Sequence, residues 1–272
     1  MTLVSTDWLN ENLNKVKIID ASWHLDKNRS AIEEYNENHI ENAIFFDLDK
    51  NSNQKKDLPH GHFLPSVSDH EKTISEMGIS NTDRIIIYCY SNLISSCRAW
   101  FQFLYFGHNP KLVSVLNGGM KKWRLEGRKV TNLKTKIIPS KYKAKENKNM
   151  IKVKSQIDEN IIKKDFTLLD ARSKNRFLGL EPEPRPGIKS GSIEGSKSIP
   201  LSEIVNIKDT TFLDTKKLRD IFNLSEIISN KIVMSCGSSV SAASLALAYS
   251  LINDDYIPKI YIGSWTEFGK NK

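Results

Sequence analysis

Residues 232–252 read IVMSCGSSVSAASLALAYSLI and place one cysteine between two apolar segments. The apolar run at residues 232–234 predicts the end of a buried strand, whereas the apolar residues from Ala242 to Tyr249 recur at helical spacing. Cys236 is therefore expected in a strand-to-helix turn made of Gly, Ser and Val.

A cysteine in such a turn is favoured as its thiolate. Loop amides and the positive end of the helix dipole point toward it, and a helix N-terminus can lower a cysteine pKa from about 8.5 to roughly 3.5–7.5. A buried structural cysteine is the alternative, since free Cys is among the most buried residue types. The polar loop favours the reactive interpretation. This expected site loop comprises Gly237, Ser238, Ser239, Val240, Ser241 and Ala242.

Length and composition predict a globular protein of one large or two ordinary domains. The chain has 272 residues, of which 39% are hydrophobic. It has three cysteines and begins MTLVSTDWLN, without a signal-like segment, so we expect a reducing, cytoplasmic location and no disulfide framework. No apolar run approaches membrane-spanning length, so no membrane association is expected.

The net charge of +8 does not indicate a nucleic-acid partner, because the lysines are spread along the chain. Nucleic-acid surfaces combine a basic stripe with interleaved aromatics. The one dense lysine region, residues 134–154, contains a single aromatic residue, Tyr142. This region also carries Pro139 and lacks an apolar period, so residues 134–150 are interpreted as a linker between domains at 1–133 and 151–272.

The two predicted domains repeat each other in four places, in matching order. The matched segments are IIDA (18–21) with LLDA (168–171), HIENAIFFDL (39–48) with SIEGSKSIPL (192–201), IIIYCYSNLISS (85–96) with KIVMSCGSSVSA (231–242), and LNGGMKKW (116–123) with YIGSWTEF (261–268). Each unit alternates short apolar strands with helical segments, which predicts an α/β fold with a mainly parallel sheet flanked by helices. Ligands bind beyond the carboxyl ends of such strands, and Cys236 is expected at one.

The chain resembles the two-domain rhodanese-type sulfurtransferases, and within them the 3-mercaptopyruvate sulfurtransferases. The resemblance covers nearly the whole chain and rests on IIDASWHL, HIENAIFFDLD, HFLP, LNGGMKKW, DARSKNRF, EPEPRPG, CGSSVSA and YIGSWTEFG, in the family's order. It implies two tandem rhodanese-like domains, a degenerate N-terminal one and a C-terminal one whose cysteine forms a persulfide. Cys236 matches that cysteine.

The site loop favours 3-mercaptopyruvate over thiosulfate as the sulfur donor. Thiosulfate enzymes of this family carry cationic residues just after the nucleophile, whereas CGSSVSA is uncharged. Ser239 and Ser241 depart from the resemblance by replacing a Gly and a Thr. Ser239 therefore requires a loop that tolerates a Cβ. Thiosulfate sulfurtransferase activity is the second interpretation.

Arg176 and Arg185 match the substrate-carboxylate arginines of the family. A guanidinium fork binds a carboxylate or α-keto acid bidentately. Two solvated surface arginines are the alternative, since most arginines are exposed. The prolines of EPEPRPG stiffen the loop that carries Arg185, as a binding loop requires.

The resemblance implies ping-pong chemistry. The Cys236 thiolate takes sulfur from 3-mercaptopyruvate and releases pyruvate, and an acceptor such as thioredoxin, a small thiol or cyanide removes the sulfur. No metal or cofactor is expected. Asp49 and His62 match positions that form a proposed proton relay with Ser238 in some members, although a loop histidine more often serves packing.

Cys89 occupies the position equivalent to Cys236 in the first repeat, where the family commonly has Asp. A second reactive thiol is one interpretation. Its loop lacks glycine and presents Tyr90, Leu93 and Ile94, which favours a structural or redox-sensitive cysteine. Cys97 is expected to be buried packing.

Three other functional classes fit less well. A cysteine phosphatase needs Arg six positions after the nucleophile, where this chain has Ala242. A cysteine hydrolase needs a histidine base, and none follows His108, so His62 would have to serve. A sulfur carrier or binding module would keep Cys236 without needing Arg176 and Arg185.

Overall fold

The computed structural model describes residues 2–55, 58–91, 93–224 and 231–270. The chain folds into two compact units. Unit 1 comprises Met1–Ser52, Leu64–Asn147 and Ile207–Thr211, and unit 2 comprises Asn53–Phe63, Lys148–Asn206 and Phe212–Lys272. The domain boundaries at residues 133 and 151 remain a prediction. In the structure, two short excursions of the chain belong to the unit that does not contain their sequence neighbours: residues 53–63 belong to unit 2 and residues 207–211 to unit 1.

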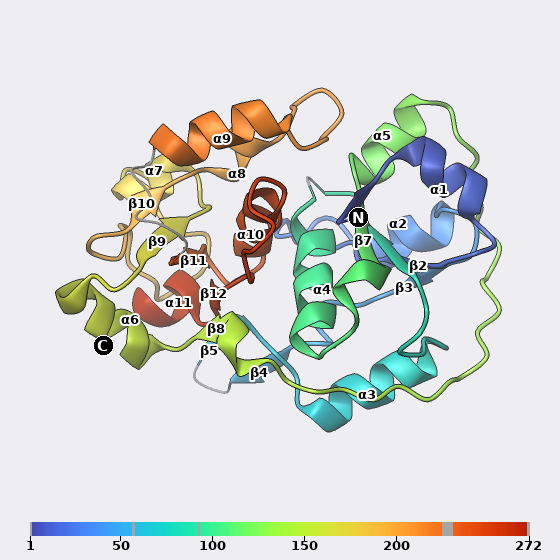
Figure 1. Ribbon diagram of the computed structural model, residues 1–272, viewed down its shortest axis with the longest axis horizontal. Coiled ribbons are helices and arrows are strands. Elements are labelled where there is room, and N and C mark those ends of the chain that lie inside the picture. Colours follow the sequence, from blue (N-terminus) through green and yellow to red (C-terminus); the bar gives the residue numbers. More distant parts are fainter. Residues whose placement is uncertain (1, 56–57, 92, 225–230, 271–272) are drawn as a thin grey trace. The chain divides into compact units, whose positions relative to one another are not determined.

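Unit 1 is built on a five-stranded sheet with the order β1-β7-β6-β2-β3, in which every neighbouring pair is parallel. Figure 1 labels β2, β3 and β7 of this sheet. Its strands are β1 (Leu3–Val4), β2 (Lys17–Asp20), β3 (Ala43–Phe45), β6 (Ile85–Tyr88) and β7 (Val113–Leu116). Its helices are α1 (Thr6–Asn12), α2 (Ala31–Glu37), α3 (Val67–Glu76), α4 (Ile94–Tyr105) and α5 (Gly119–Leu125), with a 3-10 turn at Pro110–Leu112.

Unit 2 contains a second parallel five-stranded sheet, with the order β10-β9-β11-β12-β8. Its strands are β8 (Ile151–Lys152), β9 (Thr167–Asp170), β10 (Lys197–Ser198), β11 (Ile232–Ser235) and β12 (Ile260–Tyr261). Its helices are α6 (Lys154–Lys163), α7 (Lys174–Leu178), α8 (Leu201–Ile204), α9 (Thr215–Leu224), α10 (Ala242–Ser250) and α11 (Ser264–Phe268), with a 3-10 turn at Lys148–Met150.

An antiparallel hairpin from the excursion at residues 53–63 also belongs to unit 2. Its strands are β4 (Asn53–Lys55) and β5 (Leu58–Phe63). β5 lies against α11, so a segment from the first half of the sequence reaches the helix that follows β12.

The two sheets have the same strand order when one is read in reverse. β1, β7, β6, β2 and β3 then correspond to β8, β12, β11, β9 and β10. Four of these five correspondences overlap the four sequence matches, and the two cysteine segments lie on β6 and β11; β1 and β8 lie outside the matches. The predicted fold of two α/β units with mainly parallel sheets flanked by helices is confirmed.

The stretch around Cys236 forms the predicted strand and helix. All four residues of β11 are buried, and β11 pairs with β9 and β12 on its two sides. Residues 242–249 of α10 are all buried, which explains the small and apolar residues around its whole circumference. Within the described residues, no helix is both long enough and apolar enough to span a bilayer.

Candidate active site

Cys236 lies at the carboxyl end of β11 with 1% of its surface exposed. The start of α11 holds its loop. The Oγ of Ser264 accepts the amides of Cys236 at 3.3 Å and Ser239 at 3.0 Å, and the amide of Trp265 donates to the carbonyl of Cys236 at 2.9 Å. Sequence reasoning noted YIGSWTEF as a repeat but assigned no role to Ser264.

Several loop amides remain available for an anion. The amides of Cys236 and Ser239 bond to Ser264, so these two do not serve an anion. Five other loop amides make no hydrogen bond to any residue that the structure describes: those of Gly237, Ser238, Val240, Ser241 and Ala242. An amide cradle around the sulfur of Cys236 remains a prediction, and these five amides are the ones that could form it.

Ser239 adopts the left-handed backbone conformation, with φ of 61°. Glycine is the residue that suits this conformation best, because a Cβ there is disfavoured. The buried serine is held by two hydrogen bonds: its amide donates to Ser264 Oγ, and its Oγ donates to the carbonyl of His62 at 3.2 Å. The loop thus tolerates the Cβ that the sequence places there.

Both predicted substrate arginines meet at Gly237. A Cβ added to this glycine would lie 3.0 Å from Nη1 of Arg185 and 3.2 Å from Nη2 of Arg176. Arg185 is only 8% exposed and the Arg176 side chain 17%. These are therefore not solvated surface arginines, and the guanidinium groups lie beside the residue that follows Cys236.

Glu183 fixes one of these arginines. Its Oε1 and Oε2 accept hydrogen bonds from Nε and Nη2 of Arg176 at 3.1 and 2.5 Å. Its Oε1 also accepts from Nη1 of Arg172 at 2.8 Å. The sequence showed EPEPRPG as a stiff loop, but nothing in its composition marked Glu183 as the carboxylate that orients Arg176.

Arg172 completes a buried cluster of four charges. It binds Asp170 through Nε and Nη2 and stacks over the ring of Trp265 at 4.6 Å. Burial disfavours its charge, but the hydrogen bonds that it donates to Asp170 and the charges of Asp170 and Glu183 raise its pKa above the ordinary arginine value. The cluster thus holds two cations and two carboxylates, and its Arg176 guanidinium lies beside Gly237 of the loop.

His62 joins the site from β5. Its Nδ1 lies 3.0 Å from the Oγ of Ser238, which also accepts a hydrogen bond of 2.8 Å from Nη2 of Arg185. His62 is buried. Asp49, the other predicted relay residue, belongs to unit 1, where its Oδ1 accepts from the indole Nε1 of Trp23 at 3.0 Å.

Comparisons with known proteins agree with this geometry. A sequence profile described as "Rhodanese-like domain" matches residues 5–126. The chain is 36% identical to "Thiosulfate/3-mercaptopyruvate sulfurtransferase 1, mitochondrial" of Arabidopsis thaliana, over 98% of this chain and 75% of that protein. It is 33% identical to the 3-mercaptopyruvate sulfurtransferase of Homo sapiens, over 98% and 91% of the two chains.

Its structure is similar to that of SseA from Escherichia coli, described as a 3-mercaptopyruvate sulfotransferase with the "Rhodanese" fold. The TM-score is 0.86 at 28% identity, over 97% of this chain and 99% of that one. The chain belongs to the rhodanese-type sulfurtransferases. Family members move sulfur from a donor to a thiol or cyanide acceptor, so the prediction of a sulfur-transferring enzyme is confirmed at this level.

The first rhodanese unit shows the same framework around Cys89. The amide of Met120 donates to the carbonyl of Cys89 at 3.1 Å, as Trp265 does to Cys236. The thiol of Cys89 is buried and donates to the carbonyl of Ser91 at 2.7 Å and to Ser96 Oγ at 3.3 Å. Asn92 of this loop lies outside the described residues. A structural or redox-sensitive Cys89 remains a prediction, as does buried packing for Cys97, whose side chain is fully buried.

Proposed function

We propose that this rhodanese-type enzyme takes sulfur from 3-mercaptopyruvate, holds it as a persulfide on Cys236 and passes it to a thiol or to cyanide. One observation carries the donor assignment: the guanidinium groups of Arg176 and Arg185 both lie at Gly237, directly after the nucleophile. Two guanidiniums at this place suit a donor that carries both a carboxylate and a keto oxygen.

The loop supports the same donor. Residues 237–242 carry no charge, so the site offers a thiosulfate dianion no cation on the loop itself. Arg176 already shares its charge with Glu183. A monocarboxylate with a neutral keto group needs less positive charge than a dianion does. The second candidate donor, thiosulfate, is therefore expected to react more slowly.

The first half-reaction starts with attack of the Cys236 thiolate on the thiol sulfur of 3-mercaptopyruvate. A sulfur–sulfur bond forms and the carbon–sulfur bond breaks, and its electron pair leaves as the enolate of pyruvate. Arg176 and Arg185 hold the carboxylate and keto oxygen, which aligns sulfur with sulfur and stabilises the charge that develops on the enolate oxygen. Protonation of the enolate carbon gives pyruvate.

We assign the proton transfer to the hydroxyl of Ser238, which His62 and Arg185 contact on either side. Arg185 donates to Ser238 Oγ and so favours partial negative charge there, while His62 supplies a titratable nitrogen. Asp49 stays in the proposal as the third relay member predicted from the sequence.

In the second half-reaction an acceptor thiolate, such as that of thioredoxin or a small thiol, or cyanide attacks the outer sulfur of the Cys236 persulfide. The sulfur–sulfur bond breaks and its electron pair returns to Cys236 as thiolate. The free loop amides support the thiolate at both ends of the cycle. We also infer a reducing, cytoplasmic location, because Cys89, Cys97 and Cys236 are all free thiols.

Pyruvate release from 3-mercaptopyruvate with dithiothreitol as acceptor tests the proposal, run beside thiosulfate with cyanide. The wild type should prefer 3-mercaptopyruvate, and Cys236→Ser should lose both activities. A preference for thiosulfate would overturn the donor assignment. Activity retained in Cys236→Ser would overturn the nucleophile.

A further inference from the structure

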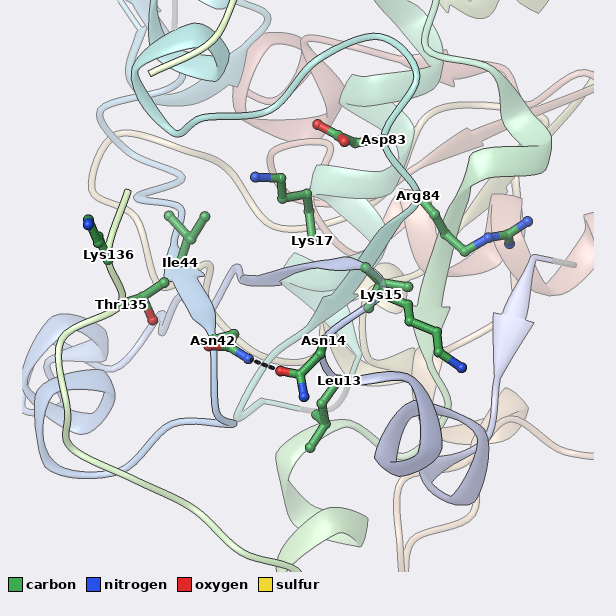
Figure 2. A pocket seen from close by; sticks show the side chains of 11 residues that line it. Leu13, Asn14, Lys15, Lys17, Asn42, Ile44, Asp83, Arg84, Thr135 and Lys136 are labelled. Carbon is green, nitrogen blue, oxygen red and sulfur yellow. Dashed lines mark hydrogen bonds between the residues drawn. The ribbon is translucent and has the colours of Figure 1, made fainter. Parts of the chain in front are cut away.

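Unit 1 contains a cavity that the proposed chemistry does not use. It has a volume of about 430 Å³ and opens at the amino ends of β2, β3 and β6, beside residues 135–136 (Figure 2). All of its lining residues belong to unit 1, whereas Cys236, Arg176 and Arg185 belong to unit 2. It is therefore a separate site.

The lining of this cavity is strongly cationic. Lys15, Lys17, Arg84 and Lys136 line it together with one carboxylate, that of Asp83. The Oδ2 of Asp83 is already held by Ser80, which donates from its amide at 2.7 Å and from its hydroxyl at 3.0 Å. The four cations make no ion pair or side-chain hydrogen bond with any residue that the structure describes.

Some cations elsewhere in unit 1 are paired with carboxylates, whereas others, such as Lys27 and Lys111, make no ion pair with a described residue. Arg29 pairs with Glu34, Lys122 with Glu126, and Arg128 with both Glu126 and Asp7. The chain therefore has carboxylates placed to neutralise basic side chains in this unit. Around the cavity, four cations face one carboxylate, that of Asp83, which already accepts hydrogen bonds from Ser80. This leaves a local excess of positive charge.

The pairing of β2 with β6 brings the backbones of two of these cations together. Lys17 opens β2, and its backbone amide donates to the carbonyl of Arg84, immediately before β6, at 2.8 Å. Figure 2 shows their side chains turned to different sides of the cavity, with Lys17 toward Asp83 and Arg84 toward the side of Lys15. The cations of the lining thus reach the cavity from more than one side.

The fourth cation, Lys136, follows Thr135, whose side chain is bonded to the backbone of β3. The hydroxyl of Thr135 donates to the carbonyl of Ala43 at 2.7 Å, which fastens this segment to the amino end of β3. Lys136 is thereby kept at the edge of the cavity. The charges thus come from three separate segments of chain that surround one space.

We propose that this cavity binds a small multivalent oxyanion, a molecule that carries two or more phosphate or carboxylate groups. Its volume lies in the range of about 300–1,000 Å³ that small-molecule sites occupy. The guanidinium fork of Arg84 matches phosphate and carboxylate geometry, and the lysines supply mobile point charges. A single monovalent group neutralises only a part of this charge, so the site selects for several negative groups on one molecule.

Isothermal titration calorimetry of the full chain tests the proposal, with inorganic tripolyphosphate, pyrophosphate and citrate as probes and sulfate for comparison. Tripolyphosphate or citrate should bind more tightly than sulfate, and the affinity should fall as sodium chloride is raised. The phosphate and carboxylate probes show which of the two groups the site prefers. Absence of binding by all three multivalent probes at low salt overturns the proposal.

Paired substitutions separate this cavity from the general basic charge of the chain. Lys17→Gln with Arg84→Gln should weaken binding by about tenfold or more, because charge-assisted hydrogen bonds are lost. Lys27→Gln with Lys111→Gln removes the same charge from exposed positions of unit 1 outside the cavity and should change affinity by less than about twofold. Equal weakening in both pairs overturns the proposal.

Folding of the variants is checked by their melting temperatures and by sulfur transfer, since none of these residues belongs to the candidate active site. Should the Lys17 and Arg84 pair unfold, Lys136→Gln gives the same test from an exposed position. That single change is expected to weaken tripolyphosphate or citrate binding by a few-fold. An unchanged affinity in a folded Lys136→Gln overturns the assignment of Lys136.

Discussion

Nη2 of Arg185 donates a hydrogen bond of 2.8 Å to Oγ of Ser238, while Nη1 of the same guanidinium lies over Gly237. One arginine therefore contacts both residues that follow the nucleophile. Through this contact, substrate binding by the guanidinium and the position of the Ser238 hydroxyl depend on each other.

Arg185→Ala should raise the KM for 3-mercaptopyruvate by about tenfold to a hundredfold, because one or two charge-assisted hydrogen bonds to the carboxylate are lost. Steady-state pyruvate release measures this. Arg219→Ala, on the exposed surface of α9, is the matched control and should leave KM unchanged. An unchanged KM in Arg185→Ala would remove this residue from substrate binding.

Glu183→Gln should raise the KM for 3-mercaptopyruvate by several-fold with a smaller change in kcat, because it loosens Arg176 without touching the sulfur chemistry. A double-mutant cycle decides whether it acts through that arginine. In an Arg176→Ala background, the further effect of Glu183→Gln on KM should vanish. Additive effects would show that Glu183 acts by another route.

Cys236 and Cys89 should differ in their ability to hold sulfur. After incubation with 3-mercaptopyruvate and no acceptor, the wild type and Cys89→Ser should each gain one sulfur atom by intact mass spectrometry, and Cys236→Ser should gain none. The reason is that the Cys89 thiol donates to Ser91 and Ser96, whereas Cys236 lies beside unoccupied loop amides. A sulfur that is retained by Cys236→Ser and lost by Cys89→Ser would assign the sulfur to Cys89 in place of Cys236, and a gain of two sulfur atoms by the wild type would make Cys89 a second carrier.

Asp20 should make the stability of unit 1 depend on pH. Burial raises its pKa from 3.8 to about 6, partly offset by hydrogen bonds from Ser22. The folded state therefore holds the proton more tightly than the unfolded state, and stability falls as pH rises from about 4 through about 6. At about 1.36 kcal/mol per pKa unit, the loss is on the order of 3 kcal/mol.

Asp20→Asn removes this titration. The difference in unfolding free energy between Asp20→Asn and wild type should therefore favour the variant more at pH 8 than at pH 4, as measured by urea denaturation at both values. Asp170, the equivalent residue of unit 2, pairs with Arg172, whereas unit 1 has Ser22 at the position of that arginine. A pH-independent difference would contradict the burial argument for Asp20.

Local sequence patterns predicted the elements around the nucleophile well. The apolar run at residues 232–234 became β11 and the helical spacing from Ala242 became α10, because both signals depend on burial within a few residues of chain. The repeat matches also predicted two similar units with mainly parallel sheets, whereas the order of the strands came from the structure.

Contacts between distant segments were beyond such patterns. The role of Glu183 becomes clear only from the two arginines that it binds, and the role of Ser264 only from the amides that donate hydrogen bonds to its hydroxyl. His62 and Ser238 are 176 positions apart and meet because the hairpin of β4 and β5 folds into unit 2. The resemblance named His62 for the site, but no periodicity or local propensity indicated this contact.

The hydrogen bonds between Ser264 and the loop of Cys236 have a consequence for biosynthesis. Ser264 follows Cys236 by 28 positions, so a ribosome makes the cysteine well before the hydroxyl that orients its loop amides. Until α11 has formed and packed, nothing holds the amides of Cys236 and Ser239 or the carbonyl of Cys236. The nucleophile loop therefore reaches its final conformation only after a segment that is translated later than the loop itself.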